Sequence, residues 1–269
     1  MRLTHRRTSN PLLSWAAPLL FGGSLLLIWW LATSLGDVEP WVFPSPREFW
    51  VAAKDLLAEP WFWQRAGTTT LEALLGSAIG ICVAVPLAWG IYRSNFIRAA
   101  LEPFLGATQA IPAVALAPLL VLWIGHGMAA IVALCALIVF FPVLVSTVVG
   151  LRGMDPDVLD AAALDGASGF RLIFSVEMPL AAPVMLAGIR NGFTLSITGA
   201  IVGEMVMGGT GLGQVLSQQK YNLDTAGMFV TVAMLALLAM TLYSLVYTLE
   251  RRLKTAADSS GKKSTRKSR

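Results

Sequence analysis

Long apolar runs separated by short polar segments dominate the pattern of this chain. A membrane-spanning helix needs about 20 consecutive, mainly apolar residues, because each residue adds ~1.5 Å and the hydrocarbon core of a bilayer is ~30 Å thick. Six runs meet this requirement: 14–35, 67–91, 101–124, 128–150, 180–207 and 226–249. The pattern therefore predicts an all-α membrane protein with six transmembrane helices.

The segment between the first two runs has a different period. From Pro46 to Ala58, apolar residues alternate with charged ones at the spacing of an amphipathic helix. Several tryptophans, which favour the membrane–water interface, lie in or beside this segment. We expect a helix on the outer membrane surface, where anchoring is favoured over contact with a solute.

Composition excludes an ordinary soluble domain. Of the 269 residues, 56% are hydrophobic and only 13% are charged, whereas soluble domains carry about 25% charged residues. If both termini are inside, 15 of the 20 Lys and Arg residues lie on the cytoplasmic side, as the positive-inside rule requires. The expected parts are a cytoplasmic N-terminus (1–13), a six-span membrane domain (14–250) and a basic cytoplasmic tail (251–269), whose charge indicates contact with anionic lipid rather than nucleic acid.

Motifs for metal binding or catalysis are missing from the sequence. His126 has no second histidine near it, so we expect no metal site. Cys82 and Cys135 both fall in predicted spans, which indicates packing rather than a disulfide. The chain also lacks a phosphate-binding loop of the type G-x-x-x-x-G-K-[ST], and its spans lack a serine elbow or a His-Glu-x-x-His helix. We therefore expect neither an enzyme nor a cofactor.

The second and third runs carry features that favour close packing and bending. Gly76 and Gly80 give the second run a small face, and Glu72 near its start favours an interfacial or hydrogen-bonded role. In the third run, Pro112 and Pro118 predict a bend. That bend either lines a cavity, with Gln109 facing it, or serves packing alone.

The fifth run is the most polar. Small residues recur every three or four positions from Gly188 to Gly203, and this stripe either lines a solute pathway or packs against another helix. The candidate pathway residues, together with Gln109, are Asn191, Ser196, Thr198 and Glu204. Glu204 is expected near the outer mouth, and Arg190 is expected to snorkel or pair near the cytoplasmic half.

The loop between the fourth and fifth runs is predicted to be cytoplasmic. Asp155 and Pro156 supply a turn before a helix expected over 157–174, and the acids near its start suit the positive helix end. Small residues lie along one side of that helix, so it can enter a groove of a partner. Gly166 allows a bend or close approach, and Pro179 marks the entry to the next span.

This loop reads Asp160-Ala-Ala-Ala-Leu-Asp-Gly166, then nine residues, then Val176-Glu-Met-Pro179. It closely resembles the EAA signature of ABC-importer membrane subunits, which is Glu-Ala-Ala, three residues, Gly, nine residues, Ile-x-Leu-Pro. The spacing matches throughout, and the departures are Asp160 for Glu, Val176 for Ile and Met178 for Leu. Phe43-Pro44-Ser45-Pro46, Phe140-Phe-Pro142 and Gly211-Leu-Gly213 extend the resemblance to permeases for nitrate, taurine and aliphatic sulfonates, a group that includes those for riboflavin and thiamin-pyrimidine precursors.

The resemblance implies a type I ABC importer permease fold with a cytoplasmic coupling helix, in a bacterial inner membrane. It implies a homodimer, a cytoplasmic ABC ATPase dimer and an extracytoplasmic solute-binding protein as partners. The coupling residues by resemblance are Asp160, Ala161, Ala162, Gly166 and Pro179. The polar residues of the spans favour a neutral vitamin or heterocyclic precursor, with sulfonate, taurine or nitrate as the alternative and an ion-gradient secondary transporter as the alternative of another class.

Overall fold

The computed structural model describes residues 11–36, 39, 41–107 and 112–267, and every regular element among them is a helix. This confirms the all-α class. Contacts divide the chain into two compact units, one formed by Met1–Glu59 with Gln219–Val230 and the other by Pro60–Gln218 with Thr231–Arg269.

The first unit contains α1 (Pro11–Leu35) and α2 (Pro46–Ala58). Its aromatic side chains form a cluster in which Trp29 contacts Phe43, Phe49 and Phe229. The boundaries of α2 agree with the amphipathic helix predicted from the sequence. Ser45 begins it with a capping box, since its hydroxyl accepts a hydrogen bond from the Glu48 amide and the Glu48 carboxylate accepts one from the Ser45 amide.

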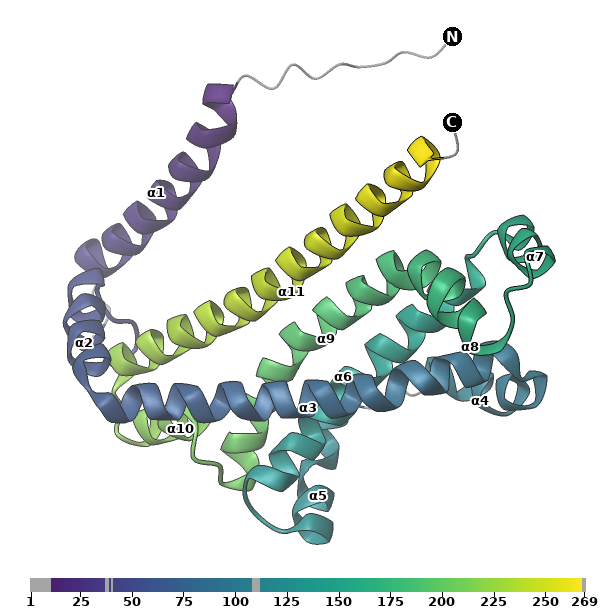
Figure 1. Ribbon diagram of the computed structural model, residues 1–269. Helices are drawn as coiled ribbons and strands as arrows, with labels where there is room; N and C mark the ends of the chain where they lie inside the picture. Colours follow the sequence, from purple (N-terminus) through teal and green to yellow (C-terminus); the bar gives the residue numbers. More distant parts are fainter. Residues whose placement is uncertain (1–10, 37–38, 40, 108–111, 268–269) are drawn as a thin grey trace. The chain divides into compact units, whose positions relative to one another are not determined.

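The second unit is built around three long helices, α3 (Pro60–Arg93), α6 (Met128–Arg152) and α9 (Met178–Met207). The most extensive packing joins α6 to α9 and α3 to α6 (Figure 1). The shorter elements are α4 (Asn95–Ala107), η2 (Ala113–Leu116), α5 (Ala117–Ile124), α7 (Pro156–Leu164), α8 (Gly169–Leu172) and the π-helical η3 (Ile173–Glu177). Two further helices, α10 (Leu212–Tyr221) and α11 (Thr225–Lys267), contribute residues to both units.

Glycines allow the three long helices to approach closely. A Cβ added to Gly76 would overlap the Cβ of Cys135, and one added to Gly80 would lie 2.8 Å from the Ala136 carbonyl oxygen, both on α6. Along α9, Gly188 and Gly192 similarly meet α6. The small stripe of the fifth run therefore packs against a helix, and the idea that its glycines line a pathway is wrong.

Four of the described helical segments are long and apolar enough to cross a membrane, namely Pro60–Arg93, Met128–Arg152, Gly169–Met207 and Thr225–Thr248. Shorter apolar helices, Leu20–Leu35 and Ala113–Ile124, fall within the first and third predicted spans. The described part of the run 101–124 is not one straight helix, in agreement with the bend predicted at its prolines. The described part of that run divides into α4, η2 and α5, because Pro112 precedes η2 and Pro118 occupies the first turn of α5, positions where a proline can begin a helix but not continue one.

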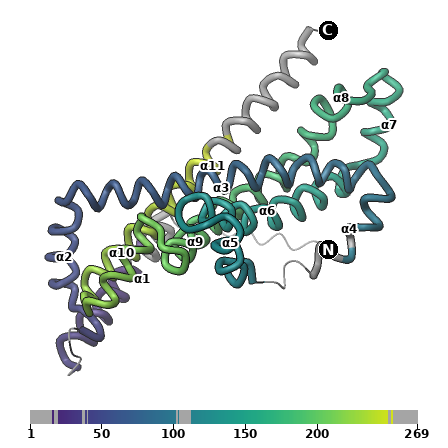
Figure 2. Tube along the Cα trace, turned by 90° about the horizontal axis from the view of Figure 1, so that it is seen from below, coloured from purple at the N-terminus to yellow at the C-terminus, as the bar shows by residue number. Residues whose placement is uncertain are grey.

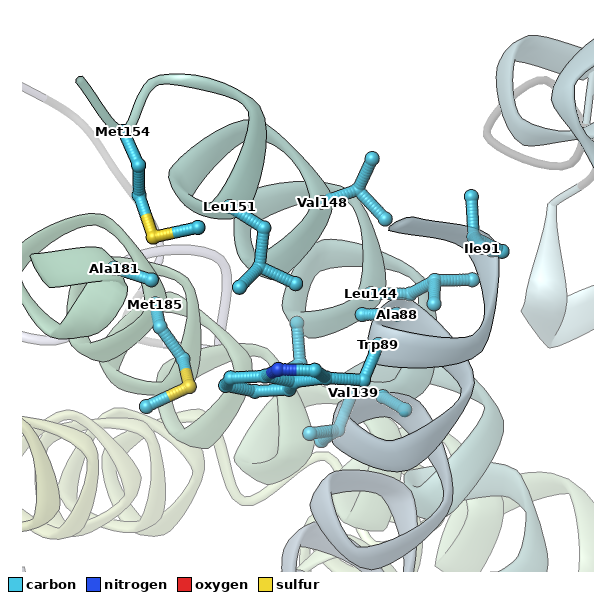
Figure 3. Close-up of a cluster of buried hydrophobic side chains, with 12 residues drawn as sticks. Ala88, Trp89, Ile91, Val139, Leu144, Val148, Leu151, Met154, Ala181 and Met185 are labelled. Atoms are coloured by element: carbon cyan, nitrogen blue, oxygen red, sulfur yellow. The ribbon is translucent and has the colours of Figure 1, made fainter. Parts of the chain in front are cut away.

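A buried apolar cluster fills the space between α3, α6 and the start of α9. Figure 3 shows the Trp89 ring lying between Met185 and Val139, with Leu151 and Met154 on the adjoining turns of α6 and the loop after it. Leu159 of α7, Ile173 of η3 and Met178 of α9 pack against this cluster. The cluster therefore connects the long helices to the segment that carries the coupling signature.

Candidate functional site

The coupling segment, residues 155–179, is folded as three short helical pieces before α9. Asp155 caps α7, because its carboxylate accepts a hydrogen bond from the Asp157 amide at 3.0 Å. This confirms the predicted turn. In the views of Figures 1 and 2, α7 and α8 lie at the end of the second unit where α3 meets α4.

The predicted continuous helix over 157–174 is wrong, because Gly166 interrupts it. Gly166 has φ +82°, a left-handed conformation that side chains with a Cβ rarely adopt. Its amide donates to the Ala163 carbonyl and the Ala167 amide donates to the Ala162 carbonyl, both at 3.0 Å. This pair of bonds is the Schellman arrangement, which ends α7 and turns the chain into α8.

The residues predicted to couple to an ATPase lie together on this segment. Asp160, Ala161 and Gly166 are exposed, Ala162 is half-buried, and Pro179 is exposed in the first turn of α9. Large apolar side chains are exposed around them, with Leu164 at 89%, Phe170 at 79% and Val158 at 42%. Apolar groups this exposed on a turn beyond the long helices suit burial against another protein.

A cavity of about 520 Å³ lies between η2, α6 and α9. Its lining includes two of the predicted pathway residues, Asn191 and Thr198, together with Ser146 of α6 and the aromatic ring of Phe141. The described lining residues carry no charge and are Ala113, Val114, Ile138, Phe141, Pro142, Val145, Ser146, Asn191, Leu195 and Thr198. The cavity can therefore accept an uncharged solute with flat apolar surfaces and a few hydrogen-bonding groups.

Ser196 and Glu204 are not among the described lining residues of this cavity. Gln109 lies outside the described residues. Ser196 is fully buried and its hydroxyl donates to the Phe193 carbonyl of its own helix. A pathway role for Gln109 and Ser196 stays a prediction.

Glu204 is also buried, at 1% exposure, where α9 turns back towards α10. One carboxylate oxygen accepts a hydrogen bond from the Thr69 hydroxyl at 2.6 Å, and the other accepts from the Gly213 amide. The Thr69 hydroxyl also accepts from the Leu212 amide at 2.9 Å. Glu204 thus fixes the loop between α9 and α10 to α3, and its predicted pathway role stays untested.

The Glu72 carboxyl group is buried beside that of Glu204. The sequence favoured an interfacial or hydrogen-bonded role for Glu72, and its Oε2 has no hydrogen-bond partner among the described residues, so that role stays a prediction. Arg190, expected to pair or snorkel, lies over the rings of Tyr243 and Tyr247 on α11, at 5.0 and 5.5 Å from their centroids. Cation–π contacts of this kind hold an arginine in an apolar setting.

One charged contact of the coupling segment was not predicted. The Glu177 carboxylate, 2% exposed, accepts hydrogen bonds from Trp89 Nε1 at 2.8 Å and from Arg93 Nη2 at 2.7 Å. Glu177 occupies the unspecified position of the Ile-x-Leu-Pro part of the signature, so the motif gives no reason to select it. A carboxylate inside an otherwise apolar stretch was the available signal.

Comparison with known proteins agrees with these features. The model of the family described as "Binding-protein-dependent transport system inner membrane component" matches residues 76–255. The riboflavin transport system permease protein RibX of Chloroflexus aurantiacus is 39% identical over 234 residues, which cover 85% of this chain and 86% of that protein. The formylaminopyrimidine transport permease protein ThiX of Halalkalibacterium halodurans is 30% identical, covering 87% and 92%.

The fold is similar to that of a solved structure as well. An inward-facing conformation of the MetNI methionine ABC transporter superposes with a TM-score of 0.64 at 16% identity, covering 72% of this chain and 98% of that chain. At this identity the similarity concerns the type I importer permease fold alone. Taken with the family match and the relatives, it leads to one conclusion: this chain belongs to the family of inner membrane components of binding-protein-dependent transport systems, the permease subunits of ABC importers.

Proposed function

We propose that this permease imports a neutral heterocyclic solute, of which riboflavin and a thiamin-pyrimidine precursor are the leading candidates. The observation that carries the proposal is the uncharged cavity between η2, α6 and α9, with Asn191 and Thr198 as polar groups and Phe141 as a flat apolar one. The names of two relatives, a riboflavin permease and a formylaminopyrimidine permease, support the same solute class.

A separate ABC ATPase dimer supplies the energy in this proposal. It docks on the coupling segment, where Asp160, Ala161, Ala162 and Gly166 are accessible and the exposed Leu164 and Phe170 provide apolar area. Binding of ATP to that dimer favours one state of the permease and hydrolysis favours the other. Such coupling requires that the partner bind the two states with different affinity.

Two copies of the chain form one pathway in this proposal, and a solute-binding protein delivers the solute from outside. The protein lies in a bacterial inner membrane with both termini in the cytoplasm, which the distribution of Lys and Arg supports. Residues 1–13 and 251–269 are then the cytoplasmic ends of a six-span permease domain at 14–250.

Two alternative functions would require different features of this chain. Import of a sulfonate, taurine or nitrate calls for a basic lining, which the described residues around the cavity do not supply. Secondary transport calls for an ion gradient and no ATPase partner.

Affinity purification from native membranes in a gentle detergent tests the partners. We expect an ATPase and a solute-binding protein to co-purify with the tagged chain. Uptake driven by an ion gradient in a preparation without an ATPase would contradict the proposal.

Reconstitution with those partners tests the solute. We expect ATP-dependent uptake of labelled riboflavin or pyrimidine precursor that excess taurine does not reduce. Asn191→Leu should lower this uptake about tenfold, because a polar group that hydrogen-bonds the solute is lost. The matched control is Thr194→Val on the same helix, whose hydroxyl bonds only to the Arg190 carbonyl among the described contacts. Uptake of taurine in place of the heterocycles would contradict the proposed solute class and support import of sulfonates.

A further inference from the structure

The contact between Glu177, Trp89 and Arg93 has no part in the signature that identifies the coupling segment. Glu177 is the last residue of η3 and directly precedes the first turn of α9, whereas Trp89 and Arg93 lie one helical turn apart near the end of α3. The two bonds therefore join α3 to the junction between the coupling segment and α9, across 84 and 88 positions of sequence.

The environment makes this contact strong. The side chain of Glu177 is 3% exposed and that of Arg93 is 42% exposed, so the ion pair is shielded on the carboxylate side only. Each carboxylate oxygen has its own donor, and hydrogen bonds to a charged group are stronger than neutral ones. Leaving a buried carboxylate without its partners is costly, and the arrangement is therefore well determined.

The backbone at this point departs from α-helical hydrogen bonding. Ile173–Glu177 is a π-helical turn, a form that is rare and recurs at functional sites. Pro179 lies two positions after Glu177 and has no amide hydrogen to donate. On the other side of the contact, Pro86 lies three residues before Trp89 within α3.

Apolar packing joins the coupling segment to α3, α6 and α9 through the buried cluster. Leu159 and Ile173 contact the buried cluster, and Gly150 of α6 lies against the Ala181 carbonyl of α9. The hydrogen bonds of Glu177 add a charged and directional contact with α3, which extends from this end of the unit to the Thr69 contact with Glu204. A displacement of the coupling segment therefore acts on α3 through the bonds of Glu177 as well as through the apolar cluster.

We propose that Glu177 is a positioning residue for energy coupling, and that its bonds to Trp89 and Arg93 transmit movement of the coupling segment to α3. The inference rests on the proposed ATPase-driven import. Glu177 touches neither the solute nor the ATPase in this account. It sets how much of the movement of the docked ATPase becomes movement of the long helices.

The test uses the complete importer, with its ATPase and binding protein, in proteoliposomes. Solute uptake and ATP hydrolysis are measured together for wild type, Trp89→Phe and Arg93→Ala, with Glu177→Gln as a third variant. Trp89→Phe keeps an aromatic ring in the cluster and removes the Nε1 donor, and Arg93→Ala changes a partly exposed side chain. Neither Trp89→Phe nor Arg93→Ala places a larger side chain in the core.

We expect the number of solute molecules imported per ATP hydrolysed to fall about tenfold in Arg93→Ala and by a smaller factor in Trp89→Phe, since a charge-assisted bond is lost in the first and a single donor in the second. ATP hydrolysis and co-purification of the ATPase should stay near wild type. The matched control is Arg98→Ala, because Arg98 is exposed and bonds locally to Asn95. Its ratio should not change.

A structural role alone would reduce uptake and hydrolysis in proportion and leave their ratio unchanged, and that result would overturn the inference. An unchanged ratio with unchanged uptake would overturn it too. A wild-type complex that lacks ATP-dependent uptake would instead contradict the proposed function, so the two failures are distinguishable.

Discussion

At the scale of single residues, the glycines of this chain meet two opposite requirements. Gly166 needs an unusual backbone conformation and has open space around it, since a Cβ there would meet nothing within 4 Å. Gly211 has no unusual backbone conformation, but it has no room for a side chain. A Cβ there would overlap the Glu204 carboxylate and the Thr69 hydroxyl. Substitutions at these positions should therefore fail for different reasons.

Gly166→Glu should abolish uptake while the protein stays in the membrane at its normal amount. A residue with a Cβ in the left-handed region costs about 1–2 kcal/mol, which reshapes an exposed turn without unfolding the buried helices. Labelled-solute uptake and immunoblotting of membranes measure the two effects. Gly67→Ala is the control, because Gly67 also has open space but no left-handed conformation, and it should transport normally. Normal uptake by Gly166→Glu would remove the coupling role of this turn.

Gly211→Ala should destabilise the protein by about 2–4 kcal/mol, because the added methyl group displaces the buried carboxylate of Glu204 from its donors. Thermal unfolding in detergent measures the loss. Gly23→Ala, at a helical position where a Cβ meets nothing within 4 Å, should leave the transition unchanged. Equal transitions for both variants would mean that the Glu204 contact does not hold the loop.

At the scale of the elements, sequence patterns predicted the structural features that depend only on residues close together in the chain. The amphipathic period predicted α2 with its observed boundaries. Gly76 and Gly80 indicated a close-packed face, and α6 lies on that face. Each of these signals is local, because it needs only the residues within a few turns.

Features that depend on distant residues were missed. The interruption at Gly166 is local, but the sequence predicts only a possible bend there, since a glycine does not by itself reveal a left-handed φ. The bonds of Glu204 to Thr69 and of Glu177 to Trp89 join positions 135 and 88 residues apart. Of the pathway residues, Asn191 and Thr198 face a common cavity, and only the packing of α9 on α6 decides which side of the helix is free.

Gly76→Ala should lower the stability of the α3–α6 contact by about 1–3 kcal/mol, because its Cβ would overlap Cys135 and overfill the interface. Gly90→Ala on the same helix is the control, since its Cβ would meet only Ile97 at an ordinary 3.6 Å. Comparison of the two unfolding temperatures checks the prediction. A Gly76→Ala protein as stable as Gly90→Ala would show that α6 can move away without cost.

At the scale of the whole molecule, the distribution of Lys and Arg predicts the orientation of the protein in the membrane. An alkaline phosphatase fused after Arg269 should be inactive, because that enzyme needs an oxidising compartment and the basic tail is expected inside. A fusion after Gly127 should be active. The opposite pattern would place the coupling segment on the side without ATP and would contradict the importer mechanism.

The carboxylates of Glu177 and Glu204 lie at opposite ends of the antiparallel helix pair α3 and α9. Glu177 precedes α9 and bonds near the end of α3, and Glu204 lies near the end of α9 and bonds near the start of α3. They are separated by roughly 40 Å of helix at ~1.5 Å per residue. Pro86 and Pro183, the prolines inside these helices, both lie near the Glu177 end.

It follows that α3 and α9 should tilt together as one rigid unit rather than slide past each other. Bending is then confined to the short stretch between the prolines and the coupling segment, where backbone hydrogen bonds are missing. A small rotation at that stretch would become a larger sideways swing at the far end, where the α9–α10 loop is held. The length of the linked helix pair, rather than the flexibility of its middle, would set how far the α9–α10 loop is displaced.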